Sequence, residues 1–316
     1  MTTLRLGTRG SQLALWQART VAGLLEERGH HVELVVMKTA GDRLQEAPLT
    51  EVGGKRLFVK EIEDALLQDE IDLAVHSAKD MSAVLPEGLE VAAVLPREDP
   101  RDALVLPHGE SMPALDDWLA RLGASPSIGT SSVRRSAQLA ALLPGASFGP
   151  IRGNVDTRLR KLDEGQFTAL VLAAAGMRRL GFAPRISAAL PVERCIPAPG
   201  QGIVAIEIRA SDGLARTAVA AISDAMAAVS LVAERTVVAA LGGGCQLPLG
   251  AISMHDNGDL HMRAIVISPD GRQVVTRQAH GTASEPARLG RILADELVRG
   301  GAIEILEEVR RAQGTS

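Results

Sequence analysis

Apolar positions divide the first 80 residues into short strands and amphipathic helices. Residues 4–6, 32–36 and 71–75 are predicted strands, and helical spacing of apolar residues separates them. Ser11 is placed to cap the first helix. The order β-α-β-α-β is typical of a parallel sheet covered by helices, so we expect an α/β lobe here.

A second α/β unit follows. Residues 103–106, 127–128 and 169–173 are predicted strands, and 132–143 a helix.

Two polar, proline-bounded stretches, 96–102 and 197–202, are predicted to connect the lobes. A strand over 203–208 is expected to return to the first sheet. Two crossings between two lobes would form a cleft that can flex.

The pattern changes near residue 224. A long helix to residue 241 precedes alternating segments typical of antiparallel strands at 251–253, 260–267 and 273–277, and helices are expected at 285–298 and 302–310. We therefore predict a small α+β third domain. The expected boundaries are 1–99 with 203–220 for domain 1, 103–199 for domain 2 and 224–316 for domain 3.

Composition narrows the function classes. The chain has 316 residues, 46% of them hydrophobic, which suffices for two or three domains with cores. Its formal net charge is −4 and it has four Phe, two Trp and no Tyr, which argues against nucleic-acid binding. There is no apolar run of about 20 residues and no signal-peptide pattern at the N-terminus, so we expect a cytoplasmic protein away from membranes.

The two cysteines are Cys195 and Cys245. Both are expected to be thiols in a reducing cytosol, with a single disulfide as the alternative. The absence of CxxC and paired-histidine motifs predicts no metal site. Cys245 follows three glycines, which indicates either a thiol that a large group can reach or a small buried apolar residue.

Basic and hydroxyl residues follow several predicted strands. They are Arg9 with Ser11, the run 130–135 (Thr130, Ser131, Ser132, Arg134, Arg135), the run 152–158 (Arg152, Gly153, Arg158), and Arg178 with Arg179. Open α/β sheets bind ligands at this end of their strands, and helix N-termini there favour anions. One such cluster is more often a solvated surface, but four together predict a single anion-binding cleft.

Residues 76–80 place His76, Ser77, Lys79 and Asp80 at the end of a strand. Asp80 has the chemistry of a general acid or base, or of a helix cap. A hydrogen-bonded core residue is the favoured interpretation of His76. Residues 53–58, which include Lys55 and Phe58, suggest either a glycine-hinged basic lid or a plain loop.

Taken together, these motifs resemble the hydroxymethylbilane synthase family, also called porphobilinogen deaminases. The matching segments occur in the family's order and are 7–11, 52–55, 74–80, 97–102, 129–135, 152–154, 199–202 and 243–246. Ala78, Met81, Ser82 and Gly242 depart from the usual pattern, and the last of these lies beside the Cys245 loop.

The resemblance implies an α/β fold with two lobes like type II periplasmic binding proteins and a small α+β C-terminal domain. It implies a transferase of porphyrin, tetrapyrrole and heme biosynthesis that condenses four porphobilinogen molecules head to tail and releases ammonia and linear hydroxymethylbilane. The cofactor would be a dipyrromethane made from substrate and joined to Cys245 by a thioether. The enzyme would be a cytoplasmic monomer that binds porphobilinogen, no nucleic acid and no membrane.

The resemblance also implies roles for individual residues. Asp80 would be catalytic, facing the pyrrole N–H groups and stabilising the cationic azafulvene left by ammonia loss, while Lys55 and Phe58 would belong to a mobile loop. The residues implied to bind cofactor and substrate are Arg9, Ser11, Ser77, Lys79, Thr130, Ser131, Ser132, Arg134, Arg135, Arg152, Gly153, Arg158, Arg179 and Gln201. Each pyrrole carries two carboxylates, so a growing chain needs many cations. Arginine, which outnumbers lysine 29 to 5, suits that need.

Two other functions fit part of the sequence. A two-lobed anion-binding protein explains the arginines but leaves Cys245 and the third domain without a role. A transferase using Cys245 as nucleophile with His76 predicts a transient thioester and no permanent adduct.

Overall fold

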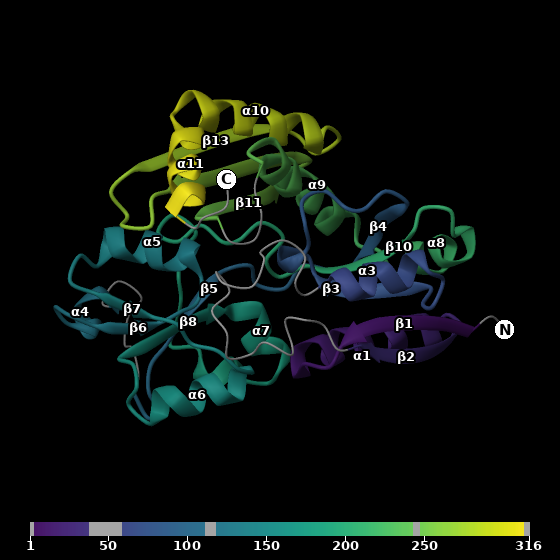
Figure 1. Cartoon of the computed structure of the whole chain (residues 1–316), viewed down its shortest axis with the longest axis horizontal. Helices are drawn as coiled ribbons and strands as arrows, with labels where there is room; N and C mark the ends of the chain where they lie inside the picture. The colour runs from purple at the N-terminus through teal and green to yellow at the C-terminus, as the bar shows by residue number, and fades with distance from the viewer. Residues whose placement is uncertain (1–2, 38–58, 111–117, 243–246, 313–316) are drawn as a thin grey trace.

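The computed structural model describes residues 3–37, 59–110, 118–242 and 247–312. Three separate sheets organise the chain, as Figure 1 shows: two sheets side by side and a third above their junction.

The first sheet has the strand order β2-β1-β3-β10-β4. Its elements are β1 (Thr3–Arg9), α1 (Gln12–Glu26), β2 (His31–Met37), α3 (Lys60–Leu67), β3 (Leu73–Ser77), β4 (Leu89–Val94), β10 (Val204–Arg209) and α8 (Gly213–Ala220). The core packs Leu25 of α1 against Leu6, Leu73 and Ile206 of the sheet. Ser11 caps α1 as expected, because its side chain accepts a hydrogen bond from the Ala14 N–H.

The second sheet has the order β7-β6-β8-β5-β9. Its elements are β5 (Asp102–Val105), α4 (Trp118–Leu122), β6 (Ser127–Gly129), α5 (Val133–Leu142), β7 (Ser147–Gly149), α6 (Val155–Asp163), β8 (Ala169–Ala173), α7 (Ala174–Arg179), a 3₁₀ turn η3 (Ala183–Arg185) and β9 (Ala188–Ala189). Apolar side chains of β8 fill both faces, with Val171 in one core cluster and Leu170 in another. The strand is therefore a continuous apolar run, which made it recognisable in the sequence.

The two crossings between the sheets contact each other. The Glu98 N–H donates to the Gly202 carbonyl at 3.0 Å, and Arg97 Nε donates to the Gln201 carbonyl at 3.0 Å. Gly202 has φ +89°, and a Cβ there would lie 2.3 Å from the Glu98 carbonyl oxygen. This close approach requires glycine.

The third sheet is antiparallel, with the order β11-β12-β13. Its elements are α9 (Ala225–Ala240), β11 (Leu249–Asp256), β12 (Asp259–Ile267), β13 (Val274–Thr282), α10 (Pro286–Arg299) and α11 (Ala302–Ala312). Leu293 and Leu297 of α10 pack with Val237 of α9 and Leu260 of β12. Asp224 caps α9, and the helix begins where the sequence predicted.

Glu234 of α9 ties the third domain to the crossings. Its carboxylate accepts from Arg97 Nη1 at 2.6 Å, from the Gly200 N–H at 2.7 Å and from the Ser253 N–H at 2.8 Å. The side chain of Glu234 is fully buried, so these donors compensate its charge.

The expectation of a parallel first sheet was wrong in part. β10 returns to this sheet as predicted, but it pairs antiparallel with both β3 and β4. In the second sheet β5 is likewise antiparallel to β8. The strands β4, β7 and β9 had not been predicted. β7 and β9 have only three and two residues, whereas β4 is an apolar run that was overlooked in the sequence.

The domain boundaries given above stay a prediction, and the three separate sheets support them. No single helix in the described segments is long and apolar enough to cross a membrane; α8 and α9 meet that test only as a pair bent by 117°.

Candidate functional site

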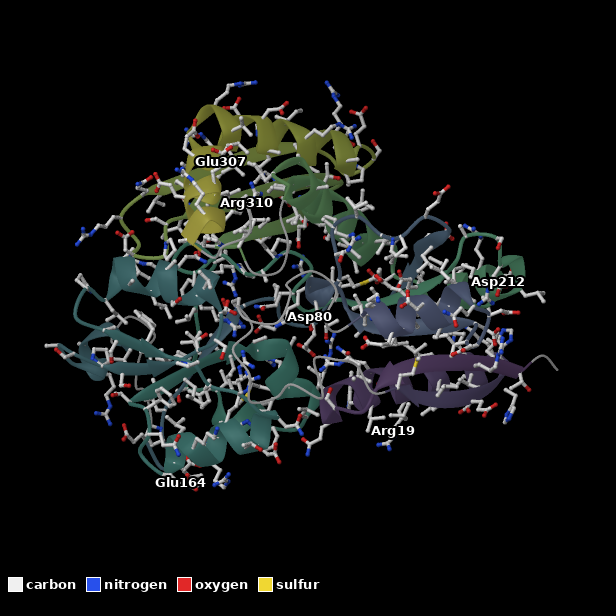
Figure 2. All side chains as sticks on the ribbon, viewed as in Figure 1. Arg19, Asp80, Glu164, Asp212, Glu307 and Arg310 are labelled. Atoms are coloured by element: carbon white, nitrogen blue, oxygen red, sulfur yellow. The ribbon has the colours of Figure 1, made fainter. Side chains whose placement is uncertain are left out.

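Asp80 lies where the three parts of the molecule meet. β3 ends in a 3₁₀ turn η1 (Ala78–Asp80), which holds both Lys79 and Asp80. The Ala78 N–H donates to the Ile203 carbonyl at 3.0 Å, which fixes the turn against the second crossing. The Asp80 side chain is exposed, and Figure 2 places it near the centre of the molecule.

A cavity of about 60 Å³ adjoins Asp80 and is lined by Arg9, Ser11 and Ser77 as well. These residues come from the ends of β1 and β3 and the start of α1. The Ser77 hydroxyl accepts from Gln17 Nε2 at 2.9 Å, which holds it in place. The first lobe thus gathers four of its predicted polar residues around one cavity, whereas Lys79 lines a different one.

His76 points into the core of this lobe. Its Nε2 lies 3.0 Å from Glu207 Oε2, and the two side chains are 3% and 0% exposed. The sequence favoured a hydrogen-bonded core histidine: its burial is confirmed, but His76 Nε2 and both carboxylate oxygens of Glu207 make no hydrogen bond of acceptable geometry.

The hydroxyl side chains of the second lobe make hydrogen bonds to backbone groups of the loops after β6 and β7. The Ser132 side chain caps α5 by accepting from the Arg135 N–H. Ser131 Oγ donates to the Ile151 carbonyl at 2.7 Å and accepts from the Ile151 N–H at 3.0 Å. Thr130 is buried, and its hydroxyl accepts from the Ser132 N–H at 3.3 Å. These residues shape the α5 N-terminus, which is where an anion is expected.

A buried carboxylate, Asp102, holds both arginines of α5. Asp102 Oδ2 accepts from Arg134 Nη1 at 2.7 Å, and Oδ1 accepts from Arg135 Nε at 2.9 Å. Cys195 Sγ donates to the same carboxylate at 3.4 Å. The two guanidinium groups keep the pKa of Asp102 below its ordinary value despite burial, while burial and Asp102 raise the pKa of the Cys195 thiol to about 12. Cys195 is therefore a neutral thiol.

Arg134 is turned into this buried cluster. Its Nη1 also donates to the Ile196 carbonyl at 2.7 Å. Its Nε is buried without a hydrogen-bond partner. Arg134 also lines a small cavity with Lys79, Ser132 and Leu247.

Gln201 links the lobes through both ends of its amide. Nε2 donates to Asp102 Oδ1 at 2.9 Å, and Oε1 accepts from Arg135 Nη2 and from Lys79 Nζ, each at 3.3 Å. The second crossing thus connects the turn that carries Asp80 to the arginines of α5.

The run 152–158 forms the loop before α6 and its first turn. Gly153 has φ +105°, and its carbonyl accepts from Arg158 Nε at 2.8 Å. Burial, together with Arg135 and Arg152 and against the opposing effect of Asp80, lowers the pKa of Arg158 to about 10.

Arg179 lies at the side of the cleft nearest α1. Its guanidinium lies 5.6 Å from the centre of the Trp16 ring, and Nη2 donates to the Gly202 carbonyl at 2.6 Å. Burial lowers its pKa.

The pKa shifts of the charged residues show that groups from both lobes face the same cleft. Burial and the neighbouring Arg135, opposed by Asp80 and Asp102, together lower the pKa of Lys79 to about 8. Lys79 and Asp80 belong to the first lobe, whereas Arg135, Arg152 and Arg158 belong to the second. Lys79 is thus within electrostatic reach of Asp80 on its own lobe and of Arg135, Arg134 and Asp102 on the other, so charged groups of both lobes meet at one cleft.

Cys245, Lys55 and Phe58 lie outside the described residues. Across the described segments, no group of three His, Cys, Asp or Glu side chains is arranged to hold a metal ion.

Comparison with known proteins decides the family. A model described as "Porphobilinogen deaminase, dipyromethane cofactor binding domain" matches residues 4–217, and one for the porphobilinogen deaminase C-terminal domain matches residues 228–299. The chain belongs to the porphobilinogen deaminase family.

Relatives in that family align over nearly the whole chain. The porphobilinogen deaminase of Acidithiobacillus ferrooxidans is 46% identical over 315 residues, 98% of this chain and 99% of that protein. That of Syntrophobacter fumaroxidans is 44% identical over 311 residues, 98% of each chain. The predicted family and transferase activity, hydroxymethylbilane synthesis with a dipyrromethane cofactor, are confirmed.

Solved structures with similar folds include the methionine-binding protein MetQ, with 15% identity and a TM-score of 0.42 over 70% of this chain and 89% of that one. Lipoprotein Tp32 from Treponema pallidum has 11% identity and a TM-score of 0.43 over 70% and 90%. The predicted fold class, two α/β lobes with a small α+β C-terminal domain, is confirmed by the three separate sheets and by the two matching family models.

Sequence reasoning missed three residues that support this porphobilinogen deaminase cleft: Asp102, Gln17 and Trp16. Asp102 carried the clearest signal, a carboxylate directly before the apolar strand residues 103–106. A charge at the edge of a buried strand needs a partner.

Proposed function

We propose that porphobilinogen condensation takes place at Asp80, in the cleft between the two lobes. The observation that carries this proposal is that Asp80 raises the pKa both of Lys79 on its own lobe and of Arg158 on the other lobe, so its carboxylate faces cations from both lobes. The cations would bind the two carboxylates of the substrate, and the exposed carboxylate of Asp80 would stabilise a cationic transition state.

Asp80 would act on the substrate through its carboxylate oxygens. These oxygens accept hydrogen bonds from pyrrole N–H groups and stabilise the positive charge that develops on porphobilinogen as ammonia leaves. Two opposite unit charges about 4 Å apart interact by about 4 kcal/mol near a protein surface. The same carboxylate is placed to receive the proton that the ring carbon loses when the new bond forms.

The surrounding cations would bind the acetate and propionate groups. Arg9, Lys79, Arg152 and Arg158 are the proposed direct contacts, with Arg179 at the α1 side. Arg135 would contribute from within its ion pair with Asp102, and Arg134 through its buried Nε, the guanidinium nitrogen that has no hydrogen-bond partner. Ser11, Ser77, Thr130, Ser131, Ser132, Gly153 and Gln201 complete the proposed binding set.

The cleft fits a dipyrromethane because its cations exceed its carboxylates. When bound, this primer would supply the pyrrole α-carbon that attacks the first substrate, and the terminal pyrrole of the growing chain would supply it in each later cycle. Cys245 is the proposed attachment point, and Leu247, two residues on, lines the same small cavity as Lys79 and Arg134. Lys55 and Phe58 are proposed to belong to a loop that excludes water.

We further propose a cytoplasmic monomer that binds neither nucleic acid nor membranes. The net charge of −4 and the scarcity of aromatic residues support the absence of nucleic-acid binding.

Asp80→Asn tests the catalytic role. Because the side chain is exposed, the variant should fold, keep its primer by intact mass, and lose turnover by a factor of about 10²–10⁴. Asp295→Asn, at an exposed position on α10, is the matched control and should retain full activity. Turnover of Asp80→Asn within a few-fold of wild type would exclude the role.

A further inference from the structure

The face of the third sheet that is turned away from α10 carries a row of exposed side chains that the cleft does not use. Met254 on β11 pairs with His261 on β12, which pairs with His280 on β13. Directly paired residues of antiparallel strands project from the same face. All three side chains are exposed. The neighbouring His255 faces the other way, with Nε2 2.9 Å from Ser230 Oγ of α9.

The two imidazoles stand at a distance that suits a shared metal ion. Their ring centroids are 6.1 Å apart, with 20° between the ring planes. A metal bonded to one nitrogen of each ring at about 2.0–2.1 Å holds the centroids roughly 5–6 Å apart. Rotation of two exposed side chains therefore suffices to aim both rings at one ion, without movement of the backbone.

We propose that Met254, His261 and His280 form a binding site for a soft transition-metal ion, with Cu(I) as the best match. A thioether favours Cu(I), and imidazole binds both copper and zinc. The thioether supplies the third ligand on this face of the sheet.

The charges on this face are compatible with a cation. Asp256 and Asp259 pair with each other at the hairpin end, two residues from Met254 and His261 respectively. Arg263 lies on the other side of the row, and Glu193 Oε1 stands 4.0 Å from its Nη1. Arg263, the cation nearest the row along β12, thus has an acidic partner. The carboxylates of Asp256 and Asp259 lie at the other end of the row.

The row occupies the uncovered end of the sheet. Farther along the same strands, Ile252 and Ile265 pack against Ala137 of α5. Because the three ligands come from three strands, an ion would bind the folded sheet and not the unfolded chain. It should therefore stabilise the protein by mass action.

The test is an anaerobic Cu(I) titration of the full-length protein, in competition with a chromogenic Cu(I) chelator. We expect one ion per chain at this site. His261→Gln and His280→Gln should each weaken binding at least tenfold, and Met254→Leu should weaken Cu(I) binding several-fold. The same titration with Zn²⁺ should be insensitive to Met254→Leu, because zinc has little affinity for a thioether.

Two surface substitutions are matched controls. His31→Gln replaces an exposed histidine of β2, and Met226→Leu replaces a methionine that is 58% exposed on α9. Neither should change the affinity. Copper that binds Cys245 would appear equally in every variant. Unchanged affinity in the His261→Gln/His280→Gln double variant would overturn the site, and unchanged Cu(I) affinity in Met254→Leu would overturn its three-ligand composition.

Discussion

Replacing Asp102 with asparagine removes the charge that holds the α5 arginines. The carboxylate is fully buried, and it accepts from Arg134 at 2.7 and 3.2 Å, from Arg135 at 2.9 Å and from Gln201 at 2.9 Å. Asparagine keeps the shape but leaves two buried guanidinium groups without a counter-charge. Breaking a buried ion pair from one side costs about 3–5 kcal/mol. That is a large share of the roughly 5–15 kcal/mol that stabilises a domain.

Equilibrium guanidinium denaturation followed by circular dichroism measures this loss. Glu164→Gln is the control, because its pair with Arg160 is exposed, with side chains 45% and 64% accessible, and should contribute no more than about 0.5 kcal/mol. A loss below about 1 kcal/mol in Asp102→Asn would refute the assignment of Asp102 as the central counter-ion.

The pH dependence gives an independent check. The pKa of Asp102 is lowered in the folded protein, so its contribution is complete above the ordinary carboxyl pKa of about 4 and is lost as the pH falls through the folded pKa. The difference in unfolding free energy between wild type and Asp102→Asn should therefore narrow as the pH falls below about 4. A difference that stays constant down to acid unfolding would contradict the reasoning.

Two further predictions concern Lys79 and Gly202. In the absence of bound carboxylates the pKa of Lys79 is about 8, so Lys79 loses its charge as the pH rises past 8 and primer assembly on cofactor-free protein should slow there. The Lys79→Met variant should assemble its primer slowly at every pH. An alkaline decline in Lys79→Met identical to that of the wild type would exclude Lys79 as the group that titrates. Gly202→Ala places a Cβ 2.3 Å from the Glu98 carbonyl at φ +89°, so it should lose at least about 1–2 kcal/mol of stability, read from thermal unfolding. Gly213→Ala, on α8 with open space around it, should not be destabilised, and equal melting temperatures for both variants would argue against a strained crossing.

Local features of the fold followed from the sequence, whereas pairings across the chain did not. The Ser11 cap and the apolar strand β8 (Ala169–Ala173) depend on short-range pattern, and both were predicted. The insertion of β10 between β3 and β4 depends on packing between distant segments, which no local spacing encodes.

The site residues likewise fall into those that the sequence predicted and those that only the structure showed. Its polar residues were recognisable as clusters after strands, because that position is general for α/β sheets. The contact of Lys79 with Gln201 joins residues 122 positions apart and emerged only from the structure. Arg134 illustrates the limit: its sequence position suggested a cleft residue, and its side chain is largely committed to Asp102.

Intact-mass spectrometry of the purified protein tests the central claim most directly. Protein made in a host that produces porphobilinogen should exceed its sequence mass by about two substrate units, and limiting added porphobilinogen should give further increments of one unit. Cys245→Ala should show the bare sequence mass and no activity. An unmodified wild-type chain, or an active Cys245→Ala variant without any adduct, would contradict the account.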